Sequence, residues 1–175
     1  MKRALEDARR DVVLNRTLED ARRDVERYEQ ALTAPDTRAR ACLEQGNVAE
    51  RQQQWAEAAQ WYQKAFDTSG AADTRADACI GLGDVAFAQK NVREARQHYS
   101  RAIELQPTYA AAYRKRGLTW AAEVPPDYER ALADARRALE LSPAFDDARR
   151  DIERYEQALK RRNRNRPNRK RNQGR

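Results

Sequence analysis

The chain has 175 residues, of which 36% are charged and 40% hydrophobic, and its formal net charge is +7. It contains no run of 18 apolar residues, so the sequence predicts no membrane-spanning helix. The first residues, MKRALEDARRDVV, include acids and lack an apolar stretch, which argues against a secretory signal. We therefore expect a cytoplasmic protein, or a nuclear one in a eukaryote. Because Gly and Pro number only 6 each and β-branched runs are few, an all-α fold is expected.

The N-terminal segment repeats the sequence of a segment near the C-terminus. DARRDVERYEQAL at 20–32 matches DARRDIERYEQAL at 147–159 at twelve of thirteen positions. The second of these segments follows the last predicted repeat. We therefore interpret residues 1–32 as a half-repeat followed by a capping-type helix. A single long helix over 5–32 is the alternative.

Three helix–turn–helix units are predicted next, at 39–72, 76–109 and 110–145. Each has a glycine in its first helix and small or aromatic residues at fixed places in its second. These residues are Gly46, Ala58, Tyr62 and Ala65, then Gly83, Ala95, Tyr99 and Ala102, then Gly117, Ala131 and Ala138. Since only a very small residue lets two helices approach closely, each glycine predicts where the helices of its unit cross.

Two further features of these units lead to structural expectations. Cys42 and Cys79 occupy the same position in successive units, which predicts buried small side chains rather than a disulfide. Val124-Pro125-Pro126 lies between the helices of the third unit. Because proline cannot continue a helix, this turn is expected to be longer than the turns of the other units.

A capping helix is expected at 145–160, followed by a basic, disordered tail at 161–175. Residues 160–175 contain 9 Lys or Arg and no acid, so the rest of the chain is nearly neutral. The residues expected to bind a polyanion are Lys160, Arg161, Arg162, Arg164, Arg166, Arg169, Lys170 and Arg171. Nucleic acid or the ribosome is the first candidate partner. An acidic protein, a membrane surface, a nuclear-localisation signal and a solubility tail are the alternatives.

One set of residues in the second unit has the spacing of a known repeat: Leu82, Gly83, Ala86, Ala95, Tyr99, Ala102 and Pro107. This spacing resembles the tetratricopeptide repeat, a helix–turn–helix unit of about 34 residues. The resemblance implies a short, right-handed helical solenoid of about three repeats with flanking capping helices. It also implies a non-enzymatic adaptor or scaffold that binds a protein or peptide segment in its concave groove.

In this family, fixed positions of each first helix line the groove. Carried over by resemblance, the residues expected to bind a partner are Arg40, Glu44, Asn47, Arg51, Asp77, Asp84, Phe87, Arg114, Lys115 and Leu118. Asn47 matches the asparagine that holds a peptide backbone in many relatives. Chaperone-binding relatives clamp a C-terminal carboxylate, and three of their clamp residues are replaced here by Leu43, Gly81 and Ala111. The resemblance therefore favours a co-chaperone less than another kind of adaptor.

The sequence recommends neither catalysis nor a metal site. His98 is the single histidine, and the spacing of the two cysteines offers no local metal-ligand pattern, so no metal, cofactor or enzyme activity is expected. Gly81-Leu82-Gly83 begins a G-x-G-x-x-A match to the dinucleotide fingerprint, but that motif needs a preceding strand and the preceding residues are expected to be helical. The alternative function is a structural subunit of a homo-oligomer or larger assembly, joined through the related helices at 18–32 and 145–159.

Overall fold

The computed structural model of the protein describes residues 17–19, 22–23 and 34–164. The expected N-terminal half-repeat and helix lie almost wholly outside these residues, as does the expected tail beyond residue 164. The described helices are α2 (Pro35–Arg51), α3 (Trp55–Thr68), α4 (Ala72–Ala88), α5 (Val92–Leu105), α6 (Ala110–Ala121), α7 (Tyr128–Leu141) and α8 (Asp146–Arg164). The described part contains no strand, which confirms the expected all-α class. No described helix is long and apolar enough to cross a membrane.

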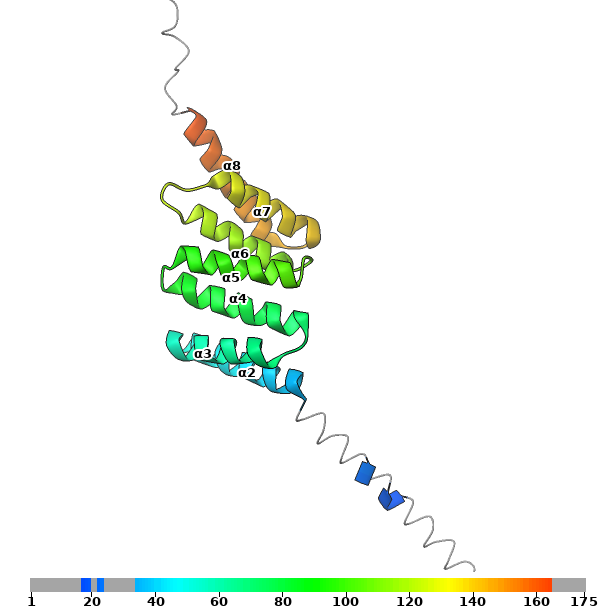
Figure 1. Cartoon of the computed structure of the whole chain (residues 1–175). Helices are drawn as coiled ribbons and strands as arrows, with labels where there is room; N and C mark the ends of the chain where they lie inside the picture. Colours follow the sequence, from blue (N-terminus) through cyan, green and yellow to red (C-terminus); the bar gives the residue numbers. More distant parts are fainter. Residues whose placement is uncertain (1–16, 20–21, 24–33, 165–175) are drawn as a thin grey trace, which may run out of the picture.

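The helices form three hairpins, α2–α3, α4–α5 and α6–α7, stacked in one row with α8 at the end of the row (Figure 1). Neighbouring hairpins are joined because α3 packs on α4 and α5 packs on α6, while α8 packs on α7. The first helices of the first two hairpins, α2 and α4, are also in contact. This contact creates the surface described below as the candidate site.

Several helix ends differ from those expected, and the local chemistry explains the differences. α2 begins at Pro35 and α4 at Ala72, each four residues ahead of the predicted unit. Proline suits a first helical turn because its N–H would be unpaired there, and both first turns carry an aspartate, which the helix dipole favours. α8 continues to Arg164, past the expected end at 160, because arginines in its last turn interact favourably with the same dipole.

The turn between α6 and α7 is the longest within the three hairpins, as the proline pair predicted. It spans 122–127, whereas the first two hairpins turn over 52–54 and 89–91. Gln53 and Lys90, at matching places in those shorter turns, both have positive φ values of 58° and 64°. The two short turns therefore share one backbone geometry, and the third hairpin departs from it.

Tyrosine rings fill the space that glycines leave open between helices. The ring of Tyr62 lies between Gly46 of its own hairpin and Gly81 of the next, and a Cβ on Gly81 would stand 2.6 Å from its Cδ1 atom. In the second hairpin, a Cβ on Gly83 would stand 2.7 Å from Cδ1 of Tyr99. A Cβ essentially never comes this close to another atom, so both rings require glycine where they pack.

Small side chains make up most of the remaining core. The alanines of the second helices that are fully shielded from solvent are Ala58, Ala65, Ala95, Ala102, Ala131 and Ala138. Cys42 and Cys79 are both buried and free, as their repeated position predicted. Burial raises the pKa of the Cys79 thiol to about 11, so this thiol stays protonated and inert at neutral pH.

Asp36, near the start of α2, ties the α3–α4 turn to the first hairpin. One of its carboxylate oxygens accepts hydrogen bonds from the Ser69 hydroxyl at 2.7 Å and from the backbone N–H groups of Gly70 at 3.1 Å and Ala71 at 3.3 Å. A proline at position 70 would lack the second donor. The bond from Ser69, followed by that from Ala71, lowers the pKa of Asp36 below its ordinary value of 3.8.

Asp36→Ala is expected to lower the midpoint of thermal unfolding at pH 7. The folded protein binds a proton on Asp36 less readily than the unfolded chain does. The stabilisation by Asp36 is therefore fully present above pH 3.8 and is lost as the pH falls through the lower pKa of the folded state. Circular dichroism melts between pH 2 and pH 7 should show the difference between wild type and variant narrowing toward the acidic end. Asp67→Ala, at an exposed position of α3, is the control; a gap between Asp36→Ala and wild type that is as wide at pH 2 as at pH 7 would contradict the assignment.

Candidate functional site

A hollow of about 290 Å³ lies where α2 and α4 run beside each other. Its lining comes from matched turns of the two helices, with side chains from α3 and from the start of α6 completing it. The lining residues are Leu43, Glu44, Asn47 and Glu50 of α2, Asp77, Ile80, Gly81 and Asp84 of α4, together with Tyr62 and Tyr109. Residues at steps of three or four share a helix face, so the two helices present equivalent rows to this hollow.

Tyrosine hydroxyls donate hydrogen bonds to three of the carboxylates in the hollow. The hydroxyl of Tyr62 donates to Glu50 at 2.6 Å, and the hydroxyl of Tyr109 donates to Asp77 at 2.6 Å. Tyr99, a buried residue of α5, donates to Asp84 at 2.8 Å. Burial, followed by the nearby carboxylates, raises the pKa of all three tyrosines far above 10, so each phenol remains a donor at any physiological pH.

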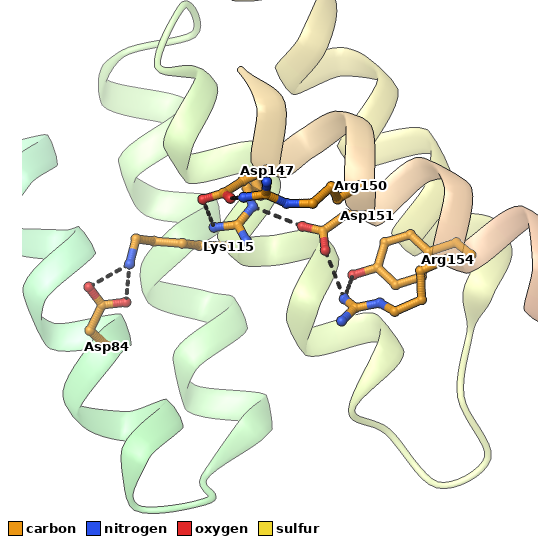
Figure 2. A network of polar contacts seen from close by, with 8 residues as sticks. Asp84, Lys115, Asp147, Arg150, Asp151 and Arg154 are labelled. Atoms are coloured by element: carbon orange, nitrogen blue, oxygen red, sulfur yellow. Dashed lines mark hydrogen bonds and ion pairs between the residues drawn. The ribbon is translucent and has the colours of Figure 1, made fainter. Parts of the chain in front are cut away.

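Lys115 forms an ion pair with one of these acids. Nζ of Lys115, on α6, lies 2.7 Å and 2.8 Å from the two carboxylate oxygens of Asp84 (Figure 2). The aspartate thus accepts one ammonium group from the neighbouring hairpin and one phenol from its own hairpin. Both groups are partly exposed, so the pair sits at the edge of the hollow rather than in the core.

The structure brings together four of the residues predicted to line a groove, namely Glu44, Asn47, Asp77 and Asp84. Arg51 lines an adjoining shallow hollow with Glu44 and Glu50. Three further predicted groove residues do not line this hollow: Arg40 is exposed near Asp73, Phe87 packs against the core, and Leu118 is half-buried.

Arg114, also predicted to line the groove, turns toward α8 instead. Its Nε lies 2.8 Å from Asp151, and one of its terminal nitrogens lies 3.5 Å from Asp147 (Figure 2 shows these acids). Arg154, one turn along α8, also contacts Asp151 at 2.9 Å and the Tyr155 hydroxyl at 3.0 Å. Asp151 is buried, so Arg114 of α6 neutralises a buried carboxylate of α8.

Sequence reasoning missed the part that tyrosines have in the hollow. Tyr62 was expected only as an aromatic residue at a fixed place in its unit, and Tyr109 was not singled out. The sequence did contain a sign of this role. Tyr109 is the last residue of its unit, and Asp77 in the first helix of that unit offers a carboxylate for its hydroxyl. The role of Gly81 was also missed, since it keeps room for the Tyr62 ring beside the hollow.

The predicted polyanion-binding residues fall partly inside the described chain. Lys160, Arg161, Arg162 and Arg164 lie in the exposed last turns of α8. Arg162 bonds to Glu129 of α7, with one nitrogen–oxygen distance of 3.1 Å, so it is not a free cation. Arg166, Arg169, Lys170 and Arg171 lie outside the described residues.

A larger hollow of about 790 Å³ lies at the other edge of the molecule, between the start of α5 and the α6–α7 turn. Its charged lining mixes both signs, with Lys90, Arg93 and Arg162 facing Glu123 and Glu129. The Arg162–Glu129 ion pair neutralises part of this lining. We therefore regard the hollow between α2 and α4 as the candidate site.

The other chemical motifs have structural explanations. His98 stands 3.8 Å from Glu94 one helical turn away, and burial lowers its pKa, so it is neutral at pH 7. Gly81 and Gly83 both lie inside α4 rather than after a strand, which rules out the dinucleotide fingerprint. Among the described residues, no three His, Cys, Asp or Glu side chains are grouped to hold a metal ion.

Stacked hairpins of this kind define the class of α-helical repeat solenoids. Two family models match the chain, one described as a TPR repeat over residues 83–122 and one as a tetratricopeptide repeat over residues 15–73. The chain belongs to the tetratricopeptide-repeat family. The second match begins at residue 15 and so includes the segment that we interpreted as a capping-type helix.

Solved structures of tetratricopeptide domains share this fold. The first such domain of Spaghetti (RPAP3), bound to the HSP90 peptide SRMEEVD, is 26% identical, with a TM-score of 0.64, over 71% of this chain and 95% of that one. The first domain of human RPAP3 is 26% identical with a TM-score of 0.65, over 73% and 97%. The OM64 domain from Arabidopsis is 25% identical with a TM-score of 0.64, over 71% and 98%. No curated protein matches the chain.

Proposed function

We propose that this protein is a non-enzymatic scaffold that binds a polypeptide segment of a partner in the hollow between α2 and α4. The observation that carries the proposal is the hollow itself, in which two helices present matched rows of polar side chains. The peptide held by the tetratricopeptide domain of Spaghetti supports this choice, because that domain shares the fold. Asn47 is exposed on α2, and its Oδ1 accepts the Tyr62 hydroxyl at 2.9 Å, so we expect its amide N–H groups to bond a peptide backbone.

A photo-crosslinking amino acid at Asn47 tests the proposal in the full-length protein. We expect it to capture polypeptides from a cell lysate under ultraviolet light. The same amino acid at Gln97, exposed on the outer helix α5, should capture far fewer. Equal capture from both positions, or none from Asn47, would contradict binding in the hollow.

The tail provides a second candidate function, that of tethering the scaffold to nucleic acid. The observation in its favour is the run of 9 basic residues without an acid in 160–175. Arginine binds phosphate readily, and the run contains no aromatic residue to stack on bases, so binding is expected to be blind to sequence.

RNA recovered with the full-length protein from the same lysate tests the tail. A variant with Arg166, Arg169, Lys170 and Arg171 replaced by glutamine leaves α8 intact through Arg164. Captured RNA should be lost in this variant, and should fall steeply with added salt in the wild type, with a log–log slope near −4 if about five phosphates are contacted. RNA recovered equally with both proteins would exclude the tail as the tether.

A further inference from the structure

The hollow between α2 and α4 is lined by acids and by no basic residue. Glu44 and Glu50 project from α2, and Asp77 and Asp84 project from α4. Glu44 and Asp77 are exposed, and Glu50 and Asp84 are partly exposed, so a ligand in the hollow can reach all four. An approaching chain therefore meets a concentrated negative charge.

The basic residues nearest to this hollow are already engaged. Lys115 binds both oxygens of Asp84, and Arg114 is bound to Asp151 on α8. On α2, Arg40 lies 3.9 Å from Asp73, while Nε of Arg51 donates to the backbone carbonyl of Asn47 and its charge stays at the rim, beside Glu44 and Glu50. Within the described part of the chain, none of Glu44, Glu50 and Asp77 forms an ion pair with lysine or arginine. Three of the four acids are thus open to a cation from outside.

The placement of the acids fits an extended chain better than a single ion. Glu44 and Glu50 are six residues apart on α2, and Asp77 and Asp84 are seven apart on α4, which corresponds to about 9–10 Å along each helix. On a polyproline II segment, which has three residues per turn and rises about 3.1 Å per residue, side chains three residues apart lie on the same face and about 9 Å apart. The acids are also too dispersed to hold a metal ion, as noted above. The Lys115–Asp84 pair shows in the molecule itself that these carboxylates accept an ammonium group.

We infer that the partner segment bound in this hollow is basic, with lysine or arginine side chains about three residues apart. The inference rests on the proposed peptide-binding function and specifies the chemistry of its ligand. It distinguishes this chain from the domain of Spaghetti, whose bound peptide SRMEEVD carries three acidic residues. Such a peptide would place carboxylates against Glu44, Glu50 and Asp77, and like charges at this distance repel.

The test measures fluorescence anisotropy of three labelled peptides with the full-length protein at low salt. The peptides are GARSARSARG, its neutral counterpart GAQSAQSAQG and its acidic counterpart GAESAESAEG. We expect binding only of the arginine peptide. The double variant Glu44→Gln/Asp77→Asn should weaken that binding by up to about tenfold, because each exposed ion pair contributes at most about fivefold. Asn at position 77 can still accept the Tyr109 hydrogen bond, so the fold should be preserved.

A matched control removes two charges elsewhere. Glu57→Gln/Asp67→Asn alters exposed acids of α3 outside the hollow and should leave binding of the arginine peptide unchanged. Equal loss in both double variants would overturn the inference, since it would indicate diffuse charge attraction. Preferential binding of the glutamate peptide, or of none of the three, would also overturn it. If crosslinking from Asn47 still captures polypeptides, these results overturn only the basic character of the ligand, and the proposed peptide-binding function stands. If that crosslinking is also absent, the proposed function fails as well.

Discussion

Tyr99→Ala is expected to lower the free energy of unfolding by about 3–5 kcal/mol, the range found when a large buried aromatic side chain is truncated. Tyr99 is 2% exposed and lies in the cluster of buried residues that joins α4, α5 and α6. Its ring occupies the space left by Gly83, so the truncation leaves a cavity that backbone movement alone cannot close. Urea denaturation followed by circular dichroism at 222 nm, with Tyr99→Phe as a companion variant, provides the measurement.

Tyr99→Phe separates the ring from its hydroxyl. The phenylalanine keeps the packing and loses the hydrogen bond to Asp84, which retains its bonds to Lys115. We expect a loss of about 0.5–1.5 kcal/mol, typical of one hydrogen bond. A loss in Tyr99→Phe as large as that in Tyr99→Ala would show that the hydroxyl, rather than the ring, stabilises this hairpin.

A second substitution tests whether Gly83 is required by the ring itself. In the wild type, Gly83→Ala should cost about 1–3 kcal/mol because its Cβ overlaps Tyr99. In the Tyr99→Ala background the overlap is gone, and alanine should stabilise α4 by up to about 1 kcal/mol through its higher helix propensity. The two substitutions are therefore expected to be strongly non-additive. Additive effects would contradict the direct contact.

The sequence spacing predicted that the helices of this unit cross at Gly83, but it did not predict that the ring packed there belongs to Tyr99. A 34-residue repeat places its glycine and its tyrosine in one unit, at fixed places on two short helices joined by a tight turn. Gly83 and Tyr99 are sixteen residues apart, so little chain intervenes to alter their approach. Gly81 was harder to interpret, because the ring that it accommodates belongs to Tyr62 of the preceding hairpin. A pattern within one unit contains no information about the neighbour that packs on it.

Charge placement was predicted less well, for a related reason. The repeat pattern assigned Arg40, Arg51, Arg114 and Lys115 to the same groove as the acids. The structure leaves the acids in the hollow and directs Arg114 to Asp151, 37 residues further along the chain. Helical position fixes the direction in which a long side chain leaves the backbone, whereas its partner is fixed by the packing of α8. The acidic character of the hollow therefore became visible only in the structure.

Arg114→Ala is expected to lower the free energy of unfolding by about 1–3 kcal/mol, because it leaves the buried carboxylate of Asp151 short of a charged partner. Arg154 remains within 2.9 Å, but its side chain is 58% exposed and it compensates only in part. The loss should appear first as detachment of α8, which would expose Ala148 and Tyr155. Amide hydrogen exchange should rise in α8 while α2 to α5 remain protected.

Two variants decide whether this loss comes from the unpaired buried charge. Arg149→Ala removes an exposed arginine of α8 that pairs with Asp146 one turn away, and it should change stability by less than about 1 kcal/mol. Arg114→Met combined with Asp151→Leu removes both charges and keeps the volume, so stability should recover to near the wild-type value. If the double variant is as unstable as Arg114→Ala, the ion pair itself holds α8 in place. If it recovers, α8 is held by apolar contacts such as Tyr155 against Tyr128, and the ion pair serves to keep a buried carboxylate neutralised.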